Sequence, residues 1–99
     1  MTQFQFGSES DDLFQAILSL NDTKECENFF RDLCTLSELK AMTERWQIVL
    51  RLKEGKSYRK IAEETGASTT TVTRVAQWLE NGANGYKKIY HRLHGSYGA

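Results

Sequence analysis

Residues 56–79 read KSYRKIAEETGASTTTVTRVAQWL, a pattern typical of two short helices joined by a tight turn. Ser57 and Ser68 stand where a serine oxygen caps the first turn of a helix. Gly66 stands where a helix needs a left-handed residue to end, a conformation that glycine adopts without penalty. Apolar residues then recur on one side at helical spacing, namely Val72, Val75, Ala76 and Leu79. The segment therefore predicts a helix-turn-helix, a motif whose second helix lies in the DNA major groove.

The 99 residues have the length of one domain and contain no proline. Apolar segments of helical period alternate with cap residues, which predicts an all-α chain of about six helices. The expected organisation is a flexible tail at 1–8, a single helical domain at 9–93 and a tail at 94–99. Within the domain we expect dimerisation helices at 9–55, the helix-turn-helix at 56–80 and a C-terminal helix at 84–93.

The apolar runs are too short for a membrane span, which takes roughly 20 residues. The N-terminus also lacks the basic and apolar pattern of a signal peptide. A cytoplasmic protein with no membrane partner is expected. Cys26 and Cys34 are eight residues apart, which is neither a metal nor a redox spacing, so we expect two buried thiols, no metal site and no cofactor.

The formal net charge is zero, but the two halves of the chain differ. Residues 1–50 carry four basic and nine acidic side chains, a net charge of −5. Residues 51–99 carry nine basic and four acidic side chains, a net charge of +5. The positive half also contains the predicted helix-turn-helix, and both features point to a polyanionic partner such as double-stranded DNA.

Cap residues divide the first half of the chain into three predicted helices. Ser8 or Ser10 is expected to cap the first, Asn21 or Asp22 the second, and Thr35 with Glu38 forms a capping box for the third. The third is the longest, at roughly 18 residues, and ends at Gly55.

All three of these helices have broad apolar stripes, which in the first two include Leu13, Phe14, Ile17, Leu18, Phe29 and Phe30. A chain this short cannot cover all of them, and large exposed apolar patches usually mark interfaces. We expect a two-fold homodimer, whose paired recognition helices would read the half-sites of a palindrome. An ordinary monomeric core is the alternative.

The helix order, the long third helix ending in glycine and the segment GKSYRKIAEETGASTTTVTR (55–74) resemble the Trp repressor superfamily. The tail LENGANGY (79–86) is similar to the YerC/YecD-like branch of small bacterial regulators. The likeness covers roughly residues 9–93. It implies an intertwined, Trp-repressor-like helical homodimer that acts as a transcriptional repressor at the bacterial nucleoid.

The resemblance places Arg59 where the family reads a guanine edge, and its planar fork matches the O6 and N7 acceptors of guanine. Thr69 and Thr70 stand where short side chains read bases through water, and Thr73 matches a phosphate contact. Hydroxyls near a helix N-terminus also suit this role by their chemistry, although Ser68 has capping as an alternative role. The predicted DNA-binding set is Lys56, Ser57, Arg59, Lys60, Ser68, Thr69, Thr70, Thr73 and Arg74.

The resemblance also implies a ligand pocket, at Thr35, Arg45, Thr71, Arg74, Val75 and Trp78. The first four match positions that hold bound tryptophan in the family. Val75 stands where the family has a glycine that makes room for the indole, and Trp78 replaces a small serine. These two enlargements argue against tryptophan as a corepressor, and we expect Val75 or Trp78 to fill part of the cavity.

Two functions agree with these patterns. The first is a dimeric, sequence-specific DNA-binding regulator, more readily a repressor than an activator. The second is a helical adaptor that keeps the motif but binds a protein of the transcription machinery, which the neutral overall charge and the few basic residues of the second helix allow. An enzyme is not expected, because the sequence has no Gly-rich phosphate loop, HExxH or GxSxG motif.

Overall fold

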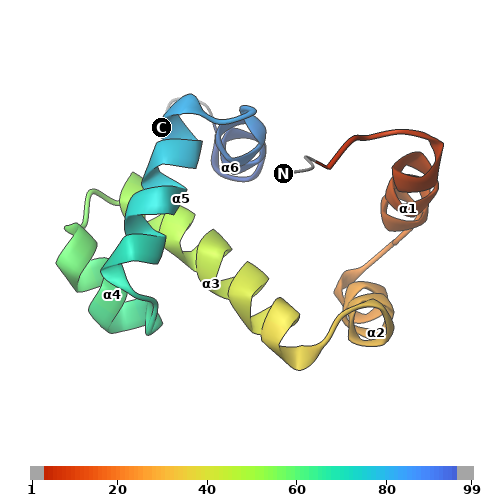
Figure 1. The fold of residues 1–99 in the computed structure, drawn as a ribbon, viewed down its shortest axis with the longest axis horizontal. Coiled ribbons are helices and arrows are strands. Elements are labelled where there is room, and N and C mark those ends of the chain that lie inside the picture. The colour runs from red at the N-terminus through yellow and green to blue at the C-terminus, as the bar shows by residue number, and fades with distance from the viewer. Residues whose placement is uncertain (1–3, 96–99) are drawn as a thin grey trace. The chain divides into compact units, whose positions relative to one another are not determined.

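The computed structural model describes residues 4–95, which form six α-helices and contain no strand (Figure 1). The all-α class predicted from the sequence is confirmed. In chain order the helices are α1 (Ser8–Leu18), α2 (Thr23–Leu33), α3 (Leu36–Lys53), α4 (Tyr58–Thr65), α5 (Thr69–Asn81) and α6 (Gly85–His94). The predicted tails at 1–8 and 94–99 lie in part outside the described residues.

The described residues divide into two compact units after Leu39, within α3, and each unit is described by itself. In the N-terminal unit, α1 begins one residue earlier than the predicted domain, and its N-cap is Gly7. Neither Ser8 nor Ser10 is the cap, so that prediction was wrong. Ser8 is already helical, and Ser10 reaches back instead, because its Oγ accepts from the Gly7 N–H at 2.8 Å and donates to the Gly7 carbonyl at 3.0 Å.

The other predicted caps of the N-terminal unit are confirmed. Asp22 caps α2, since its Oδ1 accepts from the Glu25 N–H at 2.9 Å. Thr35 and Glu38 form the reciprocal capping box, with the Thr35 N–H on Glu38 Oε1 at 2.8 Å and the Glu38 N–H on Thr35 Oγ1 at 3.1 Å. The bond from the Thr35 N–H also holds the pKa of the Glu38 carboxyl below its usual value.

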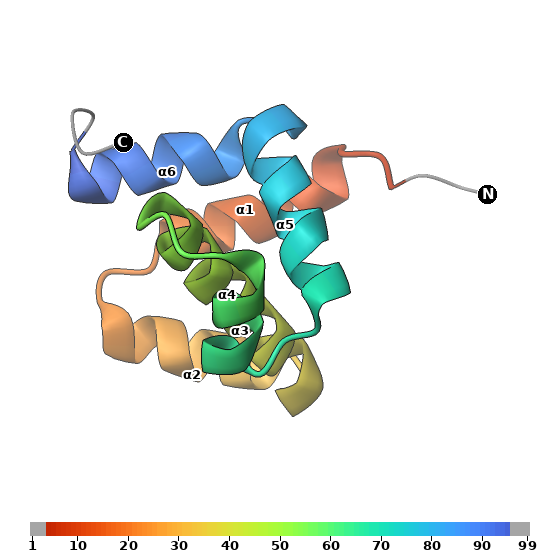
Figure 2. The same cartoon turned by 90° about the vertical axis from the view of Figure 1, so that its left-hand side faces the viewer.

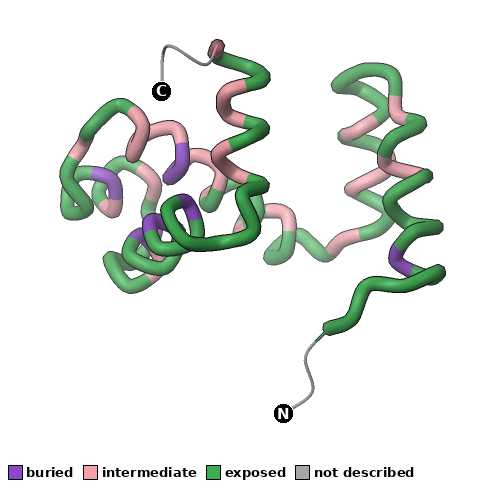
Figure 3. The backbone as a smooth tube through the Cα atoms, turned by 90° about the horizontal axis from the view of Figure 1, so that it is seen from above, coloured by how far each residue is buried: buried purple, intermediate pink, exposed green. Residues whose placement is uncertain are grey.

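Most residues of the N-terminal unit are exposed or half-buried (Figure 3), and several of its large apolar side chains are exposed. Ser10 is the only residue of this unit that is buried among those the structure describes. Leu18 is 75 % exposed, Leu33 is 48 % exposed and Leu36 is 67 % exposed. The unit therefore presents an apolar surface to water within a single chain.

The hydrophobic core lies in the C-terminal unit, where α4 and α5 pack side by side (Figure 2). It is built by α3, α4 and α5, and its fully buried members are Ile48, Val49, Ile61, Val72 and Val75. The apolar stripe predicted for the second helix of the motif is confirmed, because all four of its residues are buried. Within residues 4–95, no helix combines the length and the apolar composition that crossing a membrane requires.

Candidate nucleic-acid interface

The turn between α4 and α5 has the geometry that the sequence predicts. Gly66 ends α4 in the left-handed region, at φ +80°, and its N–H donates to the Ala62 carbonyl at 3.0 Å. Thr65 closes the turn from the other side, because its Oγ1 donates to the Ile61 carbonyl at 2.8 Å and accepts from the Ala67 N–H at 3.2 Å. A side chain at position 66 would adopt this φ at a cost, so glycine is required there for conformational reasons.

Both helices of the motif begin at a serine cap. Ser57 Oγ accepts from the Lys60 N–H at 3.1 Å, and Ser68 Oγ accepts from the Thr71 N–H at 3.1 Å. Ser68 also donates its hydroxyl proton to Thr71 Oγ1 at 3.1 Å. These bonds occupy the Ser68 hydroxyl within the protein, so capping accounts for this residue even without DNA.

The N-terminal half of α5 exposes short hydroxyl side chains. Thr69, Thr70 and Thr73 are exposed, while Thr71 is half-buried beside the cap. Thr73 Oγ1 donates to the Thr69 carbonyl at 2.9 Å, so its hydroxyl proton is already used within the helix. Arg74, one residue further on, is exposed. The opposite side of the helix is buried in the core, so the first two turns of α5 present one polar face.

On α4 the two basic residues predicted to contact DNA extend into solvent. The Arg59 side chain is 90 % exposed, and its nearest acidic partner is Glu63, with 3.9 Å between Arg59 Nε and Glu63 Oε2. Such an exposed i,i+4 pair is worth only a few tenths of a kcal/mol, about 0.3–0.5, so it barely restrains the guanidinium. Lys60 is also exposed. Both side chains project from the first turn of α4 and are free to contact a ligand there.

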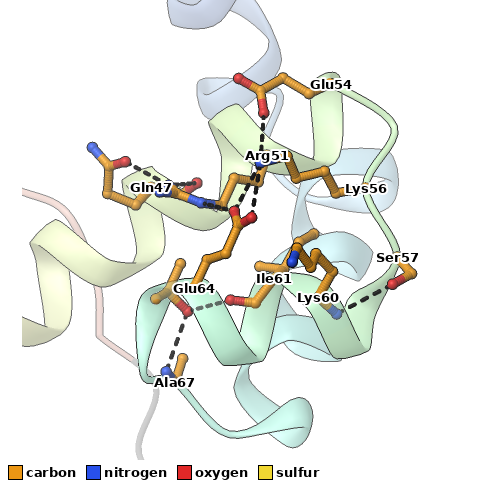
Figure 4. A network of polar contacts seen from close by, with 10 residues as sticks. Gln47, Arg51, Glu54, Lys56, Ser57, Lys60, Ile61, Glu64 and Ala67 are labelled. Atoms are coloured by element: carbon orange, nitrogen blue, oxygen red, sulfur yellow. Dashed lines mark hydrogen bonds and ion pairs between the residues drawn. The ribbon is translucent and has the colours of Figure 1, made fainter.

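Lys56 differs from these two because it is held by a network of polar contacts between α3 and α4 (Figure 4). Glu64 Oε1 lies 2.8 Å from Lys56 Nζ and 2.8 Å from Arg51 Nε. Arg51 in turn donates to Gln47 Oε1 at 2.6 Å. Hydrogen bonds from Lys56 and then Arg51 keep the pKa of the Glu64 carboxyl below its usual value, and the same carboxylate raises the pKa of Lys56.

Sequence reasoning did not find this network. Arg51 and Glu64 are thirteen residues apart, and their approach depends on how α4 folds back on α3. One local signal was present, because Lys56 lies just before the short α4, Glu64 lies in its last turn, and the two carry opposite charges. Lys56, which the sequence predicts to contact DNA, is therefore already ion-paired in the unbound protein.

The residues of the predicted ligand pocket lie in different surroundings. Val75 is fully buried and belongs to the hydrophobic core, whereas Trp78 is 47 % exposed. Arg45 is exposed, and Thr35 belongs to the N-terminal unit, where it caps α3. Thr71 and Arg74 lie on the polar side of α5 described above.

Trp78 lines an open apolar groove of about 530 Å³ in the C-terminal unit. Trp46 of α3 and Tyr86 of α6 face it, with their ring centroids 6.3 Å apart. The remaining lining residues are Ala83, Gly85 and Ile89. The groove carries none of the arginines of the predicted pocket, so it does not offer a carboxylate-binding site by itself.

The motif has two capped helices, a left-handed glycine between them, and exposed hydroxyl side chains on the first turn of the second helix. These features define the helix-turn-helix class of DNA-binding proteins. Comparison with known families gives the same result. Residues 8–94 match the family model described as Trp repressor protein, and the chain belongs to this family. The predicted resemblance is confirmed, and the family is one of DNA-binding regulators.

Individual relatives agree with this assignment. The uncharacterized protein YerC of Bacillus subtilis (strain 168) is 45% identical over 87 residues, which cover 88% of this chain and 84% of YerC. A crystal structure of a TrpR-like protein from Eubacterium eligens ATCC 27750 is 44% identical with a TM-score of 0.82, covering 85% of this chain and 87% of that one. A protein put forward as a Trp repressor from Staphylococcus aureus is 40% identical with a TM-score of 0.86, covering 92% of this chain and 91% of its own.

Proposed function

We propose that the protein is a dimeric, sequence-specific transcriptional regulator, most simply a repressor, that reads a palindromic operator with α5. The observation that carries the proposal is the polar face of the first two turns of α5, which is exposed while the apolar face of the same helix is buried in the core. A helix held this firmly by its apolar side can enter a groove without unfolding. Short hydroxyl side chains at its N-terminus suit close approach to bases and phosphates.

Individual roles follow from side-chain chemistry and exposure. Arg59 is the base-reading arginine, because it is long, planar and almost unrestrained. Thr69 and Thr70 contact bases directly or through water, and Lys60 contacts phosphate. Thr73 contacts a phosphate only if its hydroxyl exchanges the bond to its own helix for one to the ligand. The remaining members of the site are Lys56, Ser57, Ser68 and Arg74.

The proposed dimer rests on apolar surface that a single chain leaves uncovered. In the N-terminal unit this surface includes Leu18 and Leu33, and in the C-terminal unit it is the groove at Trp46 and Trp78. A second copy of the chain can cover these surfaces. In a two-fold interface each copy contributes the same surfaces, so what one copy leaves uncovered the other can bury. The domain division at 9–55, 56–80 and 84–93 is retained as part of this proposal.

We expect sedimentation at micromolar concentration to give twice the 11.4 kDa mass of the chain. The expected interface buries more than about 2,000 Å² in total, the range of obligate homodimers. A single species with the mass of one chain would contradict the proposed dimer. It would also contradict the proposal that one dimer binds both half-sites of a palindromic operator.

Tryptophan is not expected to act as a corepressor. By the resemblance, Val75, a fully buried core residue, stands where the family has a glycine, and the bulky Trp78 stands where it has a serine. Calorimetric titration with millimolar L-tryptophan should give no binding heat, and the amino acid should leave DNA affinity unchanged. A dissociation constant below about 100 μM, or roughly −5.5 kcal/mol, would contradict this expectation. The double variant Val75→Gly with Trp78→Ser is the converse test, and it should gain affinity for an indole amino acid.

Recovery of genomic fragments by the purified protein tests the function as a whole. We expect a small set of fragments that share one inverted repeat, with half-sites about one helical turn apart, some 34–36 Å. Recovery of fragments without a shared symmetric sequence would favour the alternative function, a helical adaptor that binds a protein of the transcription machinery.

A further inference from the structure

Glu64 is the centre of a compact charge cluster at the start of the helix-turn-helix (Figure 4). Its two carboxylate oxygens lie 2.8 Å and 3.0 Å from Lys56 Nζ. The same carboxylate accepts from Arg51 Nε at 2.8 Å. Glu54 approaches from the end of α3, with 3.6 Å between its Oε1 and Lys56 Nζ. The cluster therefore contains two cations and two anions and has no net charge.

Lys56 directly precedes the Ser57 cap of α4, where the first helix of such a motif crosses the DNA backbone. Its ammonium has three carboxylate oxygens within 3.6 Å. Lys60, on the next turn, has no ion pair within the part of the chain that the structure describes and is exposed. The two lysines are close in sequence, but only Lys60 has its charge available at the surface.

This difference has a physical consequence for DNA binding. A free lysine that neutralises a phosphate releases a condensed counterion from the DNA, and this release gives binding its dependence on salt. A lysine already paired with a carboxylate exchanges one ion pair for another. The exchange costs the Glu64 carboxylate one of its two cationic partners, so the net gain is small unless the phosphate is held very close to Nζ.

We propose that Glu64 is a specificity-determining residue, which withholds Lys56 from phosphates in complexes with random-sequence DNA. Lys56 becomes a contact only when base reading seats α5 and fixes a phosphate beside the start of α4. The ion pair thus weakens binding to the wrong sequences more than binding to the right one. This inference rests on the proposed DNA-binding function.

The test is the salt dependence of affinity for one random-sequence duplex, measured by fluorescence anisotropy with the full chain. Glu64→Gln keeps the size of the side chain and removes its charge. We expect tighter binding and a slope of log K against log salt steeper by about 0.9, the value for one further phosphate. Equivalently, the advantage of this variant over wild type should shrink about 3.5-fold between 50 and 200 mM salt.

Two controls separate release of Lys56 from a general change in charge. Glu63→Gln makes the same charge change on the same helix, without a bond to Lys56, and should leave the slope near that of wild type. In a Lys56→Ala background, Glu64→Gln should no longer steepen the slope. A slope that Glu64→Gln does not change, or that it still steepens without Lys56, would overturn the inference.

Lys56→Ala alone tests the same inference if loss of Glu64 unfolds α4. On random DNA its slope should equal that of wild type, whereas Lys60→Ala should lower the slope by about 0.9. A loss of that size in Lys56→Ala would mean that Lys56 is already a phosphate contact, and the inference would be wrong. Failure of the wild-type chain to bind any duplex at low salt is a different result, and would contradict the proposed function itself.

Discussion

Ile61→Ala should lower the free energy of unfolding by about 2–5 kcal/mol, the range for truncating a large buried aliphatic side chain. Ile61 is fully buried and packs in the core shared by α3, α4 and α5. The truncation removes contacts on all sides and leaves a cavity that three helices cannot easily close. Because a domain of this size has modest stability, much of the variant should be unfolded at 37 °C.

Urea unfolding at one fixed protein concentration measures this effect, because the stability of an oligomer depends on concentration. Leu93→Ala is the matched control, since Leu93 is also a large aliphatic residue on a helix but is 65 % exposed. We expect that control to lie within about 0.5 kcal/mol of wild type. Equal losses from the two variants would show that the core described here does not hold the motif together.

Arg59→Ala should cost about 1–3 kcal/mol of discrimination at one base pair of each half-site. The physical reason is the planar fork of the guanidinium, which alanine cannot replace, and its freedom from strong partners in the unbound chain. In a symmetric dimer the loss occurs twice per operator. The affinity for random DNA should fall much less.

Lys60→Ala is the comparison, because Lys60 lies on the same helix and its proposed contact is with phosphate alone. It should weaken binding to all sequences alike and lower the salt slope by about 0.9. Competition titrations of both variants, with the operator and with single-base changes in it, separate the two effects. If both variants act alike on specific and random DNA, the division between base reading and phosphate contact is wrong.

Much of the fold could be predicted because its signals are local. Ser57, Gly66 and Ser68 each satisfy a demand of the backbone within a few residues, and each has the role that the sequence predicts. The buried face of α5 follows from spacing alone, since Val72 and Leu79 recur at helical intervals. The Ser10 interaction was missed because a serine at the third helical position can reach back to a glycine cap.

The site was less predictable because its charges interact over distance. Glu64 joins Lys56 to Arg51 only after α4 has packed against α3, and the sequence cannot give that approach. The sequence predicts that Val75 or Trp78 fills part of a ligand pocket, and the structure places Val75 in the core and Trp78 beside an open groove. The different burial of Val75 and Trp78 depends on which side of α5 packs against the core, and helical periodicity in the sequence predicts that side only approximately.

The most direct measurement of the central claim is the affinity of the purified protein for a recovered genomic fragment and for a scrambled duplex of equal composition, each over a range of salt. Sequence-specific binding through α4 and α5 predicts at least about 10³-fold tighter binding to the fragment at physiological salt. Both affinities should fall steeply as salt rises, because phosphate contacts position the protein on either duplex. Equal affinities for the two duplexes, or binding to the fragment that salt does not weaken, would contradict the claim.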